Sequence, residues 1–134
     1  MPDEQVAFAH RLIDAGVDVV HGHSSHHVKA LEVYRDRPIL YGCGDLINDY
    51  EGISGNQAYR PHLAVMFLVT LDGHTGRLLH LQLVPMHMRR FRLNRPSRGD
   101  VRWLFDRLNS ECKAFGLELA LDLEAQTLEW KPSP

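Results

Sequence analysis

The stretch Val17-Asp18-Val19-Val20-His21-Gly22-His23-Ser24-Ser25-His26-His27 sets the architecture expected for this 134-residue chain. Its first four residues form a short β-branched run, which is typical of a buried strand. Gly16, just before the run, stands where a helix C-cap is expected, because apolar residues recur at helical spacing upstream, at Val6, Ala9, Leu12 and Ile13. We therefore predict a helix over residues 6–15, a strand over 17–20 and then a loop that carries four histidines.

A second strand and loop follow. The run Pro38-Ile39-Leu40-Tyr41 predicts a short strand, which ends at Gly42-Cys43-Gly44-Asp45, where two glycines permit unusual backbone angles. Residues 48–60 are polar and contain Gly52 and Gly55, so we expect a long loop that could cover a site.

The rest of the sequence predicts a hairpin, a helix and a final pair of strands. Apolar residues 62–71, turn residues 72–76 and the alternation over 78–84 predict an antiparallel hairpin. Pro96-Ser97-Arg98-Gly99-Asp100 precedes an apolar stripe at helical spacing that ends near Gly116. Strict alternation over 117–123 predicts a half-buried strand, with residues 128–130 as a short partner.

This order of elements favours a layered α/β fold, with a mixed sheet and flanking helices, over a helical bundle or a pure β-sandwich. The first helix looks like the helix of a βαβ unit, yet no strand precedes it to form the parallel neighbour. We therefore expect residues 1–134 to form a single partial domain, or the first helix to pack differently.

Composition excludes several classes of function. The formal net charge is −2, from 15 basic and 17 acidic residues, so no overall field would attract nucleic acid or an anionic membrane, which leaves only local charged patches. The longest apolar stretches, such as residues 63–71, are about half of the roughly 20 residues that a membrane-spanning helix needs. Residues 1–5 lack an export-signal pattern, and Cys43 and Cys112 form neither a metal motif nor a disulfide scaffold. Function is therefore expected from a local site.

Four of the nine histidines fall within seven residues, at His21, His23, His26 and His27. Imidazole is a good ligand for zinc, iron and manganese, and a loop after a strand can aim several rings at one point. The alternative is that these histidines cap strand ends or contact solvent. Their spacing alone leaves both interpretations open.

The loop after the second strand supplies further candidates. Asp45, Asn48 and Asp49 could ligate a metal, or could orient the histidines by hydrogen bonds to their rings. The same residue types are ordinary turn and helix-cap residues. Cys43 would need a neighbouring base to act as a nucleophile, so a packing role is favoured for it.

A basic segment lies between the hairpin and the last helix. It contains Phe91 and five arginines, Arg89, Arg90, Arg92, Arg95 and Arg98. Such a composition could bind phosphates or an acidic polymer. The alternation of Phe91 and Leu93 with arginines instead favours a solvated strand end.

Three segments, at residues 15–26, at Leu31-Glu32-Val33-Tyr34 and at residues 38–45, occur in an order that resembles the capsule poly-γ-glutamate synthesis (CapA) family. That family typically has an AGAD-hydrophobic run, a GHxPH-type loop, an IEVY segment and an IFYSLGNF-type strand and loop. Each is present here in variant form. The resemblance covers residues 6–72 and is weaker beyond them.

The resemblance implies the C-terminal half of a calcineurin-like metallophosphoesterase α/β sandwich, with a dinuclear metal site at the strand ends. On that likeness His23 and His26 would be ligands of a divalent metal, Mn, Fe or Zn. The side chains of His21, His27, Asp45 and Asn48 would be outer contacts or further ligands. A dinuclear site would activate a bridging water.

The sequence departs from the family pattern at the proposed site. Ser24 and Ser25 stand where many members have His and Pro, and Asp45 stands where they often have Asn. The family's upstream ligands would precede Met1. We therefore expect weak metal binding unless a missing N-terminal half or a homo-oligomer partner completes the set, and whether this chain is itself an enzyme stays open.

Two functions follow from the resemblance. The first is a metal-dependent phosphoesterase- or hydrolase-like protein of poly-γ-glutamate capsule biosynthesis. The alternative is a non-catalytic polyanion-binding or scaffold module of a capsule synthesis complex, which would hold the acidic polymer through the five arginines. The resemblance also implies a location in the cell envelope or at a membrane, and neither function involves nucleic acid.

Overall fold

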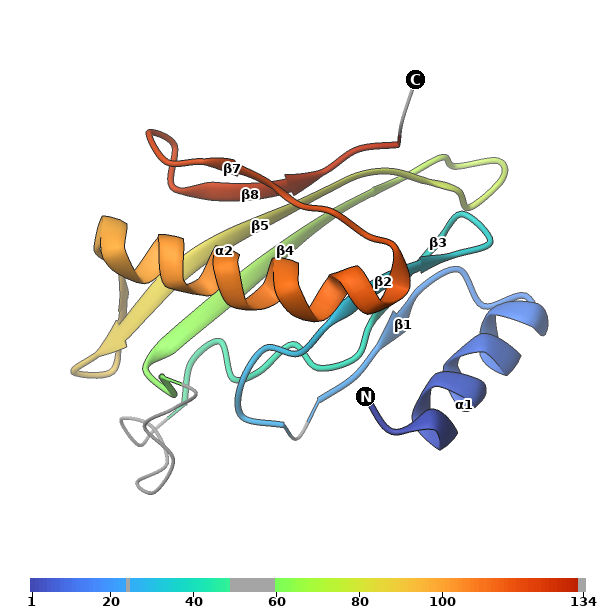
Figure 1. Cartoon of the computed structure of the whole chain (residues 1–134), viewed down its shortest axis with the longest axis horizontal. Helices are drawn as coiled ribbons and strands as arrows, with labels where there is room; N and C mark the ends of the chain where they lie inside the picture. The colour runs from blue at the N-terminus through green and yellow to red at the C-terminus, as the bar shows by residue number, and fades with distance from the viewer. Residues whose placement is uncertain (24, 49–59, 133–134) are drawn as a thin grey trace.

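The computed structural model describes residues 1–23, 25–48 and 60–132, in which two α-helices flank two β-sheets (Figure 1). The helices are α1 (Asp3–Asp14) and α2 (Arg98–Cys112), and a 3₁₀ turn over Lys113–Phe115 extends α2. The strands are β1 (Val20–His21), β2 (Leu31–Tyr34), β3 (Arg37–Leu40), β4 (Leu63–Leu71), β5 (Leu78–Arg89), β6 (Arg92–Asn94), β7 (Ala120–Asp122) and β8 (Thr127–Trp130). The expected mixed α/β fold is confirmed, and its calcineurin-like form stays a prediction.

The smaller sheet has the strand order β1-β3-β2. In it β1 runs parallel to β3, with Val20 opposite Ile39, and β2 runs antiparallel to β3. The prediction of a strand over residues 17–20 was wrong by three residues. The backbone N–H of Val17 donates to Leu12 at 3.1 Å, so Val17 still closes the end of α1 and the strand begins only at Val20.

The larger sheet is antiparallel, with the order β4-β5-β8-β7 and with β6 paired to the far end of β5. The predicted hairpin of β4 and β5 is confirmed, but β5 continues past residue 84 to Arg89. Pro85 is tolerated inside it because it lies between residues 81–83, which pair with β8, and residues 87–89, which pair with β6. No ladder hydrogen bond is therefore lost on that side.

The strand predicted over residues 117–123 is shorter than expected and spans Ala120–Asp122. Leu117 and Leu119 are buried as the alternation predicted, but they lead into the sheet without belonging to it. The backbone N–H of Leu119 donates to the side-chain oxygen of Asn109 in α2 at 3.0 Å, in place of a strand partner. Its partner strand β8 is confirmed.

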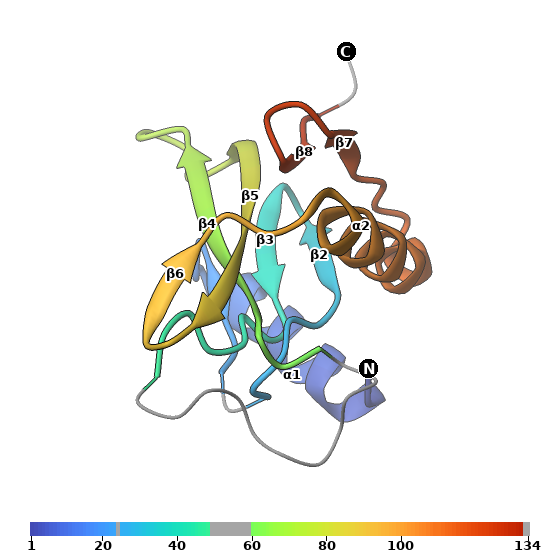
Figure 2. The ribbon, with the colours of Figure 1, turned by 90° about the vertical axis from the view of Figure 1, so that its left-hand side faces the viewer.

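Most of the core lies between the two sheets and α2 (Figure 2). The helix contributes buried residues at helical spacing, Val101, Leu104, Leu108 and Cys112. Each large apolar side chain buried in this way stabilises the fold by about 1.5–3 kcal/mol. A second cluster forms where α1 packs through Ala9 and Ile13 against Ile39 of β3. The smaller sheet is therefore covered on both faces.

Two features of this fold matter for function. Because β1 and β3 are parallel neighbours, the loops that follow them leave the same edge of the sheet. In the described ranges, no helix is long and apolar enough to cross a membrane.

The predicted loop over residues 48–60 falls almost wholly on residues 49–59, which lie outside the described ranges, as do Ser24 and Asp49.

Candidate functional site

The histidine loop and the loop after β3 are joined by backbone hydrogen bonds. The N–H of Cys43 donates to the carbonyl of Gly22 at 3.0 Å, and the N–H of Lys29 donates to the carbonyl of Gly42 at 2.9 Å. Val28 and Cys43 also form an isolated antiparallel bridge. The two loops therefore form one surface at the end of the smaller sheet.

Glycines allow this close approach. A Cβ atom at Gly22 would lie 2.4 Å from the carbonyl oxygen of Tyr41, which is too close for any other residue. Gly44 has φ +68°, in the left-handed region, and a Cβ there would lie 3.0 Å from the carbonyl carbon of His27. The glycines of both loops thus bring the histidine backbone against the second loop.

The contact between the loops brings His26 and Asp45 together. The Nδ1 atom of His26 lies 2.8 Å from Oδ2 of Asp45, and the Asn48 amide donates to the same oxygen at 3.1 Å. The His26 side chain is 45% exposed and that of Asp45 is 28% exposed, so solvent reaches the pair. Oδ1 of Asn48 is buried and has no hydrogen-bond partner in the described part of the chain. Three of the predicted site residues therefore form one cluster.

The other histidines of the loop do not all join this cluster. His27 lines a separate hollow with Lys29, Arg107 and Glu111, and burial there lowers its pKa. The backbone of His26 is left-handed, with φ +55°, where the loop changes direction between the two histidines. His21, on β1, lines an apolar groove beside Cys43 and β4. His23 is exposed on the loop and makes an interaction of its own.

The His26 cluster fits part of a metal site. Because Nδ1 of His26 faces a carboxylate, Nε2 is the ring nitrogen left for a ligand, and metal-binding histidines usually have such a carboxylate behind them. The unpartnered side-chain oxygen of Asn48 could coordinate a cation or accept a hydrogen bond. Over residues 1–23, 25–48 and 60–132, however, no group of three or more His, Cys, Asp or Glu side chains could hold a metal ion alone. The assignment of His23 and His26 as metal ligands therefore stays a prediction.

Cys43 fits a packing role. Burial raises the pKa of its thiol to about 11, and the side chain packs against the main core. A thiol with that pKa is protonated at neutral pH and is a poor nucleophile. The raised pKa and the core contact therefore both favour packing over reactivity for this cysteine.

A buried polar network below the site was not predicted from the sequence. His10 of α1 lies 2.8 Å from one carboxylate oxygen of Glu32, and the Tyr41 hydroxyl donates to the other at 2.5 Å. The Glu32 side chain is buried, and His10 stacks flat on Tyr34 at 3.8 Å between ring centroids. This network ties α1 to β2 and to the residue after β3. A Glu within an apolar strand pattern is the signal that could have revealed it.

All five arginines of the basic segment are exposed. Arg89 ends β5 and Arg92 begins β6, so the interpretation as a solvated strand end fits the structure. Arg95 donates to the carbonyl of Ala125 at 3.4 Å. None of the five forms an ion pair within the described residues.

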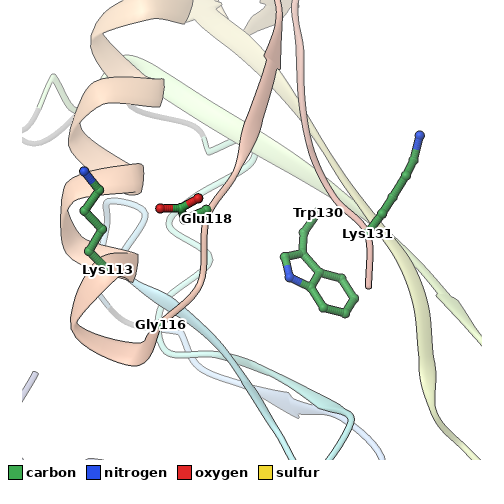
Figure 3. A pocket seen from close by; sticks show the side chains of 5 residues that line it. All are labelled: Lys113, Gly116, Glu118, Trp130 and Lys131. Carbon is green, nitrogen blue, oxygen red and sulfur yellow. The ribbon is translucent and has the colours of Figure 1, made fainter. Parts of the chain in front are cut away.

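A second hollow lies at the C-terminal end of α2, and its charged side chains do not form a cluster like that of His26 (Figure 3). It is lined by Lys113, Gly116, Glu118, Trp130 and Lys131. The Glu118 carboxylate points toward the helical segment that carries Lys113, whereas Lys131 extends away from the indole of Trp130. The charged groups do not converge on a common point.

Comparison with known proteins agrees with the resemblance. The family model described as "Bacterial capsule synthesis protein PGA_cap" matches residues 1–50, which include both loops of the site as far as Asn48. Two "probable polyglutamine synthesis accessory proteins" from strains of Mycobacterium tuberculosis are each 49% identical over 114 residues, which is 85% of this chain. An uncharacterized protein of Sinorhizobium fredii is 43% identical over 47 residues, 35% of this chain and 10% of that protein.

The chain spans about 30% of the length of the mycobacterial relatives that it matches. The family match falls on the helix, strands and loops that build the His26 cluster, and the mycobacterial match extends well beyond them. By these likenesses the chain belongs to the CapA-type family of bacterial capsule synthesis proteins.

Proposed function

We propose that this chain supplies one part of a divalent-metal site in a protein that acts in the synthesis or turnover of a bacterial glutamyl polymer. The observation that carries the proposal is the contact of His26 with Asp45, backed by Asn48. The polymer class comes from the family and from the names of the mycobacterial relatives, which specify polyglutamine synthesis. The polymer expected from the sequence resemblance, poly-γ-glutamate, belongs to the same glutamyl class.

Each residue of the cluster has a distinct task in this proposal. Asp45 accepts a hydrogen bond from the Nδ1–H of His26, which fixes the tautomer and leaves the Nε2 lone pair for the metal. The Asn48 amide donates to the Asp45 carboxylate and holds it in place. The Asn48 side-chain oxygen stays available as a hard ligand. His23, on the same exposed loop, is the second imidazole of the proposed set.

A bound divalent metal would supply Lewis-acid activation of water for hydrolysis of a phosphoester or amide bond. Imidazole with carboxylate and amide oxygen suits Mn, Fe or Zn. In this proposal His26 binds the metal, Asp45 orients the His26 ring, and the remaining metal ligands would come from outside the cluster. The proposal therefore assigns a partial site, with affinity that depends on what completes it.

Metal binding tests the proposal directly. Equilibrium dialysis of the purified chain against Mn²⁺ and Zn²⁺ is expected to show saturable binding that His26→Ala weakens at least tenfold. His74→Ala is the matched control, because His74 is an exposed loop histidine in the β4–β5 turn, far along the chain from the site. Equal binding by wild type and His26→Ala would overturn the assignment of His26 as a ligand.

The polymer role needs a second readout. In the bacterium that encodes the chain, His26→Ala is expected to change the amount or the length of cell-associated glutamyl polymer, measured after acid hydrolysis and by gel filtration. His74→Ala is expected to leave both unchanged. Unchanged polymer in a variant that has lost metal binding would separate the metal site from polymer synthesis and refute the functional half of the proposal.

A further inference from the structure

The β5–β6 hairpin has a turn that its sequence does not favour. Arg90 and Phe91 occupy its two central positions with φ values of +51° and +57°. Two-residue turns of this type are normally built from Asn and Gly, because other side chains are strained in the left-handed region. Two bulky residues are therefore held at the tip at some cost in free energy.

The hairpin is held in this shape by contacts at its base. The side-chain amide of Asn94 donates to the carbonyls of His87 and Arg92, at 3.2 and 3.1 Å, and reaches that of Arg89 at 3.4 Å. The Gln126 amide donates to the carbonyl of Pro96 at 2.9 Å, which fixes the exit of the hairpin to the β7–β8 turn. Side-chain hydrogen bonds therefore support the hairpin at its base and at its exit.

The tip exposes an aromatic ring among guanidinium groups. Phe91 is 59% exposed, and Arg89, Arg90 and Arg92 beside it are exposed. The start of α2, with Arg98 and then Arg102, lies at the same end of the molecule as this turn (Figure 1). In the part of the chain that the structure describes, none of these arginines forms an ion pair.

The nearest carboxylates at this end are already engaged. Asp100 pairs with Arg60 at 2.6 Å and accepts from Ser97, and Asp122 accepts from the backbone of its own turn. In the ranges that the structure describes, Glu124 in that turn and Asp106, one helical turn after Arg102, are exposed carboxylates that form no ion pair. A chain with net charge −2 therefore concentrates uncompensated positive charge at one end.

We propose that this basic hairpin docks onto the surface of an anionic phospholipid bilayer. The arginines would bind lipid phosphates, for which the guanidinium fork is well suited, and Phe91 would enter the boundary between headgroups and acyl chains. A hairpin turn that exposes an aromatic side chain among arginines fits the interfacial region of a bilayer. A dissolved acidic polymer would engage the arginines and leave the ring in water. This inference does not rest on the metal site.

Vesicle sedimentation tests the proposal. The chain is expected to bind vesicles of phosphatidylglycerol and phosphatidylcholine and not vesicles of phosphatidylcholine alone. Arg90→Gln and Arg92→Gln are each expected to weaken binding by about fivefold, and Phe91→Ser at least as much. Phe8→Ser is the matched control, since Phe8 is 61% exposed on α1 away from the hairpin, and should bind as wild type.

Fluorescence distinguishes lipid from polymer. Phe91→Trp is expected to be quenched by brominated lipid in the anionic vesicles, beyond the wild-type background of Trp103 and Trp130. Phe8→Trp should show no added quenching. Absence of binding to the anionic vesicles, or binding in which the indole introduced by Phe91→Trp stays unquenched and Phe91→Ser has no effect, would overturn the proposal. Soluble polyglutamate that binds the chain equally with and without Phe91 would then identify the hairpin as a site for a dissolved polyanion.

Discussion

The Nδ1 atom of His26 lies 2.8 Å from Oδ2 of Asp45, across two loops that leave neighbouring parallel strands. Because an outer carboxylate orients a metal-binding imidazole and raises its basicity, Asp45→Ala is expected to weaken metal binding by about 10- to 100-fold. Competition with a chromogenic chelator measures this loss. Asp36→Ala, which removes an exposed carboxylate paired with Arg77, is the control and should bind as wild type. Equal affinities for both variants would show that the contact does not serve a ligand.

The approach of the two loops depends on Gly44. Gly44→Ala is expected to destabilise the fold by about 1–2 kcal/mol, because alanine is strained at φ +68° and its Cβ would press on the backbone of His27. Urea unfolding followed by circular dichroism measures the change. Gly73→Ala is the matched control, since a Cβ there meets nothing within 4 Å. An equal effect of the two substitutions would contradict the proposed role of Gly44.

How far the sequence predicted this fold depends on whether the deciding interaction is local. The α2 helix, the β4–β5 hairpin and β8 follow from spacing and turn residues, and all three are observed. The strand β2 was not predicted, because its turn to β3 is formed by Arg35 and Asp36 with positive φ and lacks the usual Gly or Asn. A turn of that kind is stabilised by its pairing and not by its own sequence.

In the candidate site too, local sequence predicted some features and tertiary contacts determine the others. Two loops after two strands predicted that histidines and acidic residues would meet, and His26, Asp45 and Asn48 do. Spacing could not select His26 over His27, because the left-handed backbone at His26 sends the adjacent ring to another hollow. Nor could it place His10 on Glu32, 22 positions away, since that contact exists only once α1 packs on the sheet.

The buried network at Glu32 predicts a stability difference between two tyrosines. Tyr41→Phe removes the hydroxyl that donates to Glu32 and is expected to cost about 1–3 kcal/mol, because a buried carboxylate loses a partner. Tyr34→Phe is the control: its ring stacks on His10, and the substitution keeps the ring. Urea midpoints at pH 7 compare the variants. A loss for Tyr34→Phe, which keeps the stacked ring, as large as that for Tyr41→Phe would contradict the assignment of this stabilisation to the hydrogen bond from Tyr41 to Glu32.

The same network predicts a pH dependence with a definite sign. Burial and then the hydrogen bond to Glu32 raise the pKa of Tyr41. The folded state therefore holds this proton more tightly than the unfolded state, so the stabilisation is complete below the unfolded pKa of about 10 and falls as pH rises above it. The free energy of unfolding of wild type is expected to decline from pH 10 upward more steeply than that of Tyr41→Phe. Parallel curves would show that the Tyr41 hydroxyl does not cause the decline.

Cys43 offers a test of whether the surface between the loops contains a reactive thiol. Burial raises its pKa to about 11, and burial likewise raises the pKa of Cys112 to about 11. A thiol of that pKa is only about 0.1% ionised at pH 8, so alkylation of the folded chain by iodoacetamide should be slow and should rise about tenfold for each pH unit. Mass spectrometry of the two cysteine peptides measures each rate, with the chain unfolded in urea as the fast reference. Rapid labelling of Cys43 at pH 7, with Cys112 protected, would show a low-pKa thiolate and would restore this cysteine as a candidate nucleophile beside the histidine loop.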